Sequence, residues 1–140
     1  DLDQSIQLVQ QIAPLGVDLI DCSSGGIAPN AKIPVAPNYQ VPFADEIKSE
    51  TGILTGAIGM ISSAAQAEAI LREGRADVVS MAREFLRQPY WPLNVAHAEG
   101  FAASWPVQYL RAAPAGTPPR EPAELPEGTR KTLERKAGTD

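Results

Sequence analysis

Two short runs of small and apolar residues, separated by one predicted helix, constrain the fold of this chain most. The first is Gly56-Ala57-Ile58-Gly59-Met60-Ile61 and the second is Val78-Val79-Ser80-Met81-Ala82-Arg83-Glu84. Each run is typical of a buried strand, and strands separated by a helix usually pair in parallel. Small residues at the end of a strand let a ligand approach the backbone N–H groups, which can then hold a phosphate. The two runs therefore predict a phosphate site at the carboxyl edge of a parallel sheet.

The rest of the chain continues the alternation of helices and strands. We predict helices over 3–15, 43–50, 62–73 and 92–99, strands over 17–22, 53–58 and 76–81, a long loop over 23–39 and a helical turn over 84–87. This order is typical of right-handed βαβ units of the α/β class. Three parallel strands would leave two long unpaired edges. We therefore expect residues 1–111 to be the C-terminal part of a larger (β/α)8 TIM barrel, with a preceding helix, whose first part is not in this chain.

Local signals place the ends of these helices. Pro14 removes a backbone donor, so we expect the first helix to end or distort there, with Gly16 just beyond it. Gly52 ends the second helix. We expect Asp3 to cap the first helix, Ser62 or Ser63 to cap the third, and Ala65, Ala69, Ile70 and Leu71 to form the apolar side of the third.

In a (β/α)8 barrel, the loops after the last two strands and a helix N-terminus form the recurrent phosphate site. Arg83 adds a cation with several donors, which suits a phosphate dianion. An alternative interpretation is that Arg83 only caps the strand end and pairs with Glu84 or another surface acid.

Composition excludes several classes of protein. The net charge of −5 argues against a general nucleic-acid binder and against a protein of anionic membranes. The single histidine, His97, is expected at the surface, and no cluster of His, Cys and carboxylate residues has metal-ligand spacing. No apolar run reaches roughly 18 residues, so we expect no membrane span. The single cysteine, Cys22, fits a reducing cytoplasm and lies in an apolar run, which predicts a buried structural thiol.

The composition changes after residue 111. Residues 112–140 are rich in proline, glycine and charge and contain few large apolar residues. Such a segment cannot bury enough surface to fold alone, so we predict an extended or disordered tail. Alternatives are a strap packed along a neighbouring subunit and a short helix at 127–136.

Several motifs together resemble one family. They are the run from Gly16 to Gly26, Tyr39-Gln40-Val41-Pro42-Phe43-Ala44, the run from Gly56 to Ile61, Gly74-Arg75-Ala76-Asp77, Ala82-Arg83-Glu84-Phe85-Leu86-Arg87 and Trp105-Pro106-Val107-Gln108-Tyr109. The combination resembles the Old Yellow Enzyme family, and within it the YqjM-like (thermophilic-like) NADPH dehydrogenases. The resemblance covers about residues 3–111 in one register.

The resemblance implies an FMN-dependent ene-reductase on a (β/α)8 barrel. In that family NADPH reduces FMN, and the flavin then reduces the C=C bond of an activated alkene such as an enone. The resemblance further implies a cytoplasmic homodimer or dimer of dimers, completed by the first part of the barrel, covalently or as a separate chain. Nucleic acid, membrane and metal are not among the expected partners.

The resemblance also implies roles for individual residues near the flavin. Ala82 and Arg83 match a Gly-Arg pair that binds the FMN phosphate. Gly59, with Ala57 and Ile58 before it, matches the preceding strand end that lines the phosphate. Ser24 matches a serine near the ribityl-phosphate arm, although it could be only a turn residue.

Two further residues match a segment that acts on a neighbouring subunit. Arg111 matches an arginine inserted across the dimer interface into the partner's active site, with Tyr109 close to the same place. Arg111 could instead be a solvated tail residue, and we expect Trp91 and Trp105 to be packing anchors. The family's catalytic residues match no residue of this segment. Two other functions stay open: a flavin-free phosphate-binding barrel enzyme, and a non-catalytic complementing fragment of a split barrel.

Overall fold

The computed structural model describes residues 1–25 and 27–118 of the 140-residue chain. Its contacts divide the chain into two compact units, residues 1–91 and residues 92–140, which are described separately. The predicted helix at 127–136 and the tail from residue 119 onward lie outside the described residues. Within the described part, no helix is long and apolar enough to cross a membrane.

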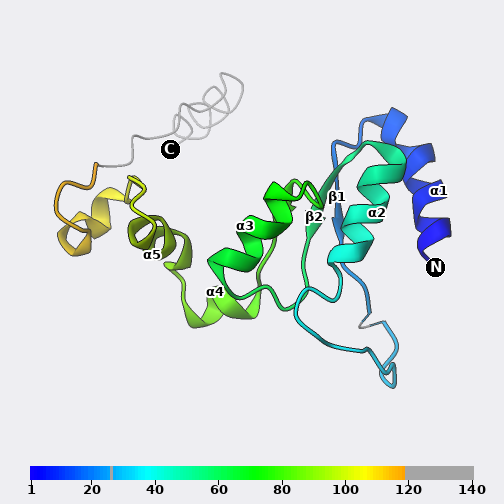
Figure 1. The fold of residues 1–140 in the computed structure, drawn as a ribbon, viewed down its shortest axis with the longest axis horizontal. Helices are drawn as coiled ribbons and strands as arrows, with labels where there is room; N and C mark the ends of the chain where they lie inside the picture. Colours follow the sequence, from blue (N-terminus) through cyan, green and yellow to red (C-terminus); the bar gives the residue numbers. More distant parts are fainter. Residues whose placement is uncertain (26, 119–140) are drawn as a thin grey trace, which may run out of the picture. The chain divides into compact units, whose positions relative to one another are not determined.

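The first unit contains a sheet of three parallel strands, β1 (Leu19–Cys22), β2 (Leu54–Ala57) and β3 (Val78–Val79), in that order (Figure 1). Cys22 lies opposite Ala57, and Ala57 lies opposite Val79. The predicted alternation of parallel strands with helices is confirmed. The strands are shorter than predicted, since their flanking residues do not pair with the next strand.

The first helix, α1 (Leu2–Ile12), is capped by Asp1. Its carboxylate accepts from the Gln4 N–H at 3.0 Å, and the Gln4 side chain accepts from the Asp1 nitrogen at 3.0 Å. The prediction of Asp3 as the cap was therefore wrong, because this reciprocal pair starts the helix earlier. The distortion expected at Pro14 is confirmed: a 3-10 turn, η1 (Ala13–Leu15), follows and ends at Gly16.

Two further helices follow β1 and β2. Helix α2 (Val41–Thr51) ends at Gly52, and helix α3 (Ala64–Arg72) is capped by Ser63. Ile70 is buried and Ala67 half-buried, because these two positions, three apart, face the core. The apolar side predicted for this helix was wrong at Ala65, Ala69 and Leu71, which are exposed.

After β3 come a short helix, α4 (Arg83–Arg87), and helix α5 (Trp91–Ala98). Trp91 is half-buried and packs on Phe85 with ring centroids 6.0 Å apart. In the second unit a 3-10 turn, η2 (Val107–Ala112), follows Trp105, which is buried and donates its backbone N–H to the Pro118 carbonyl at 3.3 Å. Both tryptophans are packing residues, as predicted.

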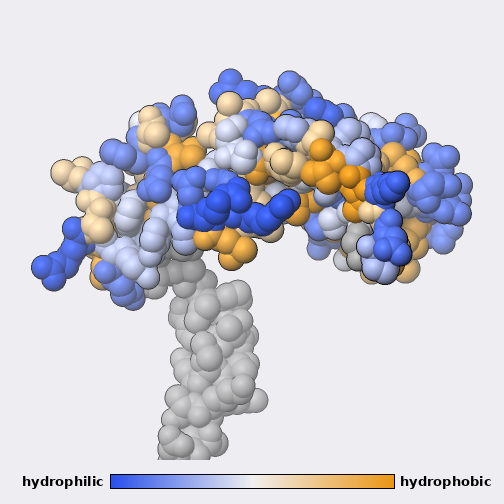
Figure 2. Space-filling view, turned by 90° about the horizontal axis from the view of Figure 1, so that it is seen from below, coloured by the Kyte–Doolittle hydropathy of each residue, from blue (hydrophilic) through white to orange (hydrophobic). Residues whose placement is uncertain are grey.

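The two faces of the sheet differ. Cys22, Thr55 and Ala57 are buried with the apolar side chains of α1, α2 and α3 in one core. On the opposite face Leu19, Leu54 and Val78 are 38%, 50% and 45% exposed. Hydrophobic side chains accordingly reach the surface among hydrophilic ones (Figure 2). One face of this sheet is packed by the described helices and the other is not.

Candidate functional site

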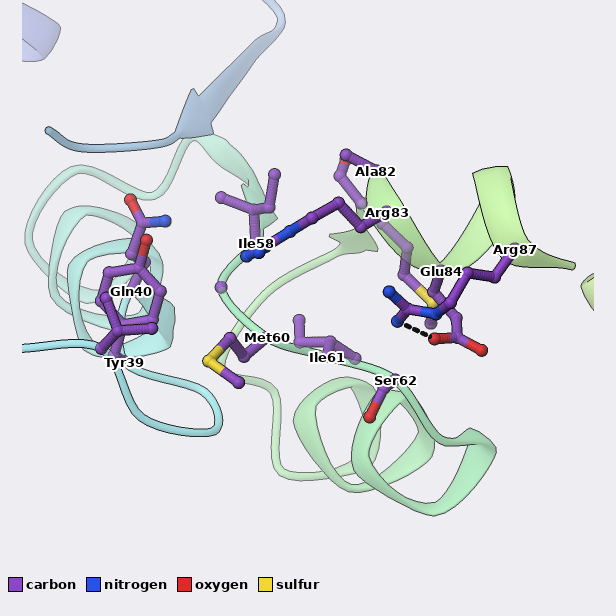
Figure 3. Close-up of a pocket in the computed structure, with 14 residues that line it drawn as sticks. Tyr39, Gln40, Ile58, Met60, Ile61, Ser62, Ala82, Arg83, Glu84 and Arg87 are labelled. Carbon is purple, nitrogen blue, oxygen red and sulfur yellow. Dashed lines mark hydrogen bonds and ion pairs between the residues drawn. The ribbon is translucent and has the colours of Figure 1, made fainter. Parts of the chain in front are cut away.

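A cavity of about 400 Å³ lies at the carboxyl ends of β2 and β3 (Figure 3). Its walls are residues 58–62 after β2 and residues 80–83 after β3, with Val35, Tyr39, Gln40, Glu84 and Arg87. The structure thus brings together the two strand ends that the sequence singled out. Parallel strands present their carboxyl ends at one edge, where α/β proteins bind their ligands.

Gly59 lets the first strand-end loop lie against the segment that precedes α2. Its φ of +119° is rarely adopted by residues with a side chain. A Cβ there would lie 3.0 Å from the Gln40 nitrogen and 3.2 Å from Cδ1 of Tyr39. Backbone conformation and lack of space therefore both require glycine at this wall of the cavity.

Arg83 begins α4, and its side chain is exposed at the cavity. Within the described residues it forms no hydrogen bond or ion pair. In Figure 3 it extends toward Ile58, at the end of β2. A guanidinium without a carboxylate partner, facing a cavity lined by strand ends, can bind an anion.

The alternative pairing of Arg83 with Glu84 is wrong. Glu84 is buried, and its carboxylate accepts from Arg87 and from Nε2 of Gln88, the latter at 2.6 Å. Figure 3 shows the Arg87 guanidinium turned toward Glu84. Burial of a carboxylate is tolerated when charged and polar donors satisfy it, so Glu84 is already occupied.

Ala82 and Ala57 contribute in different ways. Ala82 lines the cavity with a φ of −99°, a conformation that alanine adopts without the left-handed strain that would require glycine. Ala57 is fully buried in β2, and its carbonyl accepts from the Ser80 N–H at 2.8 Å. Ala57 therefore connects the ends of β2 and β3 through its backbone and does not line the cavity.

Ser24 is exposed and does not line the cavity, but it is joined to a residue that does. Its backbone N–H donates to Oε1 of Gln40, which is 5% exposed. Gln40 belongs to one of the motifs of the family resemblance, but the sequence predicted no role for it. The signal that could have found it is its position directly before a helix that starts with apolar residues.

Tyr109 and Arg111 belong to the second unit. Both lie on η2, and both are exposed. Their predicted action on a neighbouring subunit stays a prediction, as do the roles of Ser24, Ala57, Gly59, Ala82 and Arg83 toward a flavin.

Among the described residues, Cys22 is neither an activated thiol nor part of a metal site. Burial, followed by the charge of Asp21, raises the pKa of the Cys22 thiol to about 11, so this thiol stays protonated near neutral pH. Cys22 is therefore a buried structural thiol, as predicted. Across the described residues, no three His, Cys, Asp or Glu side chains are grouped as a metal site would need.

Comparison with known proteins places this chain in a family. Residues 1–99 match the NADH:flavin oxidoreductase / NADH oxidase family. The chain is 51% identical over 112 residues to an NADPH dehydrogenase of Halalkalibacterium halodurans, covering 80% of this chain and 33% of that protein. It is 59% identical over 96 residues to an NADPH dehydrogenase of a Geobacillus species, covering 69% of this chain and 28% of that protein. An NADPH dehydrogenase of Bacillus licheniformis is 55% identical over 97 residues, or 69% of this chain and 28% of that protein.

The chain spans about a third of the length of these relatives. The match nevertheless covers the whole first unit, including the cavity and Arg83. Identities above half over about a hundred residues leave no doubt of common descent. The chain belongs to the NADH:flavin oxidoreductase / NADH oxidase family, the Old Yellow Enzyme family that its motifs resemble.

Proposed function

We propose that this chain is the C-terminal portion of an FMN-dependent NADPH:alkene oxidoreductase and that its cavity binds the FMN phosphate. The observation that carries the proposal is Arg83, a guanidinium with no carboxylate partner among the described residues, at a cavity formed by two strand ends. The family of the chain acts on flavins. The phosphate of FMN is an anion, and a guanidinium at the cavity can bind it.

The fold supports a larger assembly around this segment. Leu19, Leu54 and Val78 leave one sheet face apolar and exposed, although strands of a (β/α)8 barrel are packed on both faces. The matched relatives are about three times longer than the matched segment. We therefore assign the three strands to the end of a barrel whose earlier strands cover this face.

In the complete enzyme, bound FMN would supply the redox chemistry between NADPH and an activated alkene. The residues of this chain bind and orient. Arg83 would hold the phosphate by its charge and its several N–H donors, and residues 58–62 and 80–83 would form the walls around it. No residue of this segment is assigned to hydride or proton transfer.

One further feature of the proposal concerns the assembly, and another concerns the cellular compartment. Arg111, exposed on η2, reaches the active site of a neighbouring subunit in a homodimer or a dimer of dimers. The single thiol, Cys22, which stays protonated, fits a reducing cytoplasm.

The experiment is reconstitution of the complete enzyme with FMN. We expect a yellow protein that absorbs at roughly 450 nm, the absorption of the flavin itself, and that, with oxygen excluded, oxidises NADPH through many turnovers only when an enone such as cyclohexenone is present as the electron acceptor. A complete protein that takes up no FMN but binds a sugar phosphate would support the flavin-free alternative, which the family assignment disfavours. A flavin-loaded protein that reduces no activated alkene would contradict the proposed reaction.

A further inference from the structure

We propose that Gln66, a residue of α3 that does not line the cavity, is a positioning residue that holds the cavity wall in the shape that binds the ligand. The inference deepens the proposed function and rests on it for the identity of the ligand. The support that Gln66 gives to the cavity wall follows from its hydrogen bonds to other described residues.

The cavity wall contains backbone that needs external support. Among the described residues, two non-glycine residues have positive φ: Asn38 at 62° and Met60 at 51°. Asparagine tolerates this left-handed conformation, whereas methionine adopts it rarely because its Cβ crowds the following carbonyl. Met60 lines the cavity, and Asn38 directly precedes Tyr39 and Gln40, which also line it. Strained backbone of this kind persists only where its surroundings hold it.

Gln66 contacts both of these residues. Its Nε2 donates to the Met60 carbonyl at 3.3 Å and to Oδ1 of Asn38 at 3.1 Å. Its Oε1 accepts from the backbone N–H groups of Ser62 and Ser63 at 3.1 and 3.2 Å. Backbone donors on one side and a backbone acceptor on the other fix the orientation of this amide.

One side chain therefore joins three segments: the N-terminus of α3, the loop after β2 and the segment before α2. Asn38 and Gln66 are 28 positions apart in the chain, so their hydrogen bond closes the wall across a large sequence separation. Without the donation to its carbonyl, Met60 is free to relax toward negative φ, and without the other donation Asn38 is no longer joined to α3. That relaxation would change the shape of the loop 58–62 that lines the cavity, and the ligand would bind more weakly.

The choice of glutamine points to the same role. Gln66 is the third residue of α3 and forms a capping box with Ser63. Glutamate serves equally well at this position of a capping box, because only acceptor oxygens are needed there. Only an amide can also donate to Met60 and Asn38. Cap formation alone therefore does not require glutamine, whereas support of the cavity wall does.

The test uses four variants of the complete enzyme. Gln66→Glu keeps the acceptors of the cap and loses both donations, and Gln66→Met loses both without adding charge. Ser63→Ala removes the cap hydroxyl, with its contacts to the Gln66 N–H and Oε1, and keeps both donations from Nε2 of Gln66, so it is the matched control. Met60→Gly combined with Gln66→Met is the rescue, because glycine adopts positive φ without a tether. The readouts are FMN affinity by fluorescence titration and hydrogen exchange of residues 58–62.

We expect Gln66→Glu and Gln66→Met each to weaken FMN binding roughly tenfold, as the loss of two neutral hydrogen bonds implies. Exchange of 58–62 should become faster in both. Ser63→Ala should change FMN affinity by less than about twofold, and the added Met60→Gly should restore most of the affinity lost in Gln66→Met. Equal effects of the two Gln66 variants at high salt would show that charge is not the cause.

Three results would overturn the inference: unchanged FMN binding and exchange in both Gln66 variants, an equal loss of affinity in Ser63→Ala, or no recovery with Met60→Gly. The exchange measurement also separates this inference from the proposed function. If the complete enzyme binds no FMN, the proposed function fails. Faster exchange of 58–62 in Gln66→Met and not in Ser63→Ala would then still support the positioning role, and equal exchange would contradict it.

Discussion

Arg83 and its neighbour Glu84 have different environments and different partners. Glu84 is buried and satisfied by Arg87 and Gln88, which leaves the Arg83 guanidinium without a carboxylate partner among the described residues. Were Glu84 paired with Arg83, the positive charge at the cavity would be neutralised. The local pairing within α4 therefore preserves an anion-binding cation at the strand ends.

We predict that Arg83→Ala in the complete enzyme weakens FMN binding roughly 10- to 150-fold, because a hydrogen bond to a charged group contributes about 1.5–3 kcal/mol. Fluorescence titration measures this loss. Arg72→Ala is the control, since Arg72 is an exposed arginine of α3 that pairs with Glu68 away from the cavity. FMN affinity within about twofold of wild type in Arg83→Ala would rule out its contact with the phosphate.

Gly59 and Gly74 provide a matched pair of glycines. Both have positive φ, +119° and +71°, but a Cβ at Gly74 would meet nothing within 4 Å, whereas one at Gly59 would meet Gln40 and Tyr39. Gly74→Ala should lose about 1–2 kcal/mol of stability from backbone strain alone. Gly59→Ala should lose about 1–3 kcal/mol more from overpacking and should also weaken FMN binding. Thermal denaturation of the two variants measures the difference, and equal losses would contradict the close packing of Gly59.

At the scale of elements, two ion pairs attach α2 to the turn between α3 and β3. Lys48 pairs with Asp77 at 2.8 Å, and Arg75 pairs with Asp45 at 3.0 Å. Asp77 also accepts from the Thr55 N–H at 2.9 Å, so the same carboxylate joins α2 to β2. These contacts hold α2 and β2 in fixed relation next to the cavity.

Asp77 makes this connection sensitive to acid. The hydrogen bond from Lys48, followed by that from the Thr55 backbone, lowers the pKa of Asp77 below its ordinary value of 3.8. A carboxylate whose pKa is lower in the folded state stabilises the protein at any pH above its pKa in the unfolded state. This stabilisation is lost as the pH falls from 3.8 through the lower pKa of the folded state. We predict that Asp77→Asn makes stability less dependent on pH in that acidic range.

The measurement is denaturant unfolding of the complete enzyme from neutral to acidic pH. Glu50→Gln is the control, because Glu50 is an exposed acid near the end of α2 without an ion pair among the described residues. Identical pH profiles for wild type and Asp77→Asn would contradict the assigned role of this carboxylate.

At the scale of the whole molecule, the exposed sheet face decides whether the segment is stable alone. Leu19, Leu54 and Val78 present apolar surface with no covering element among the described residues. We predict that these 140 residues, expressed alone, aggregate or melt without a cooperative transition, because an open sheet exposes both this face and its strand edges. Calorimetry of the isolated chain, beside the complete enzyme, measures this. A sharp two-state transition of the isolated monomer would contradict it.

The second prediction at this scale concerns Arg111. In the proposed dimer it adds positive charge where the partner's flavin and substrate carry developing negative charge. Arg111→Ala should leave FMN content nearly intact and lower kcat/KM about tenfold or more.

Mixed dimers test whether Arg111 acts on the partner. They join an Arg111→Ala subunit to an Arg83→Ala subunit, at an FMN concentration that leaves the latter empty. The loaded site then receives Arg111 from its partner, so activity should recover. Mixed dimers that form and stay inactive would place Arg111 outside the partner's site.

The sequence by itself determined the alternation of parallel strands and helices, the ends of several elements, and the family. These features follow from short-range signals: apolar periodicity, Gly16 and Gly52 at helix ends, and Ser63 as a cap. The two strand-end runs, which predicted a shared site, line one cavity, because the carboxyl ends of parallel strands meet at one edge. All of this is encoded within a few residues of each feature.

Only the tertiary structure decided which partners those residues take. It paired Glu84 with Arg87 instead of Arg83, turned α3 so that Ile70 and Ala67 face the core, and joined Gln66 to Asn38. Each choice depends on which distant segments approach one another and on which donors remain unsatisfied there. Periodicity within one segment carries no such information, because the hydrogen-bond partner of a side chain is set by the packing of the whole fold.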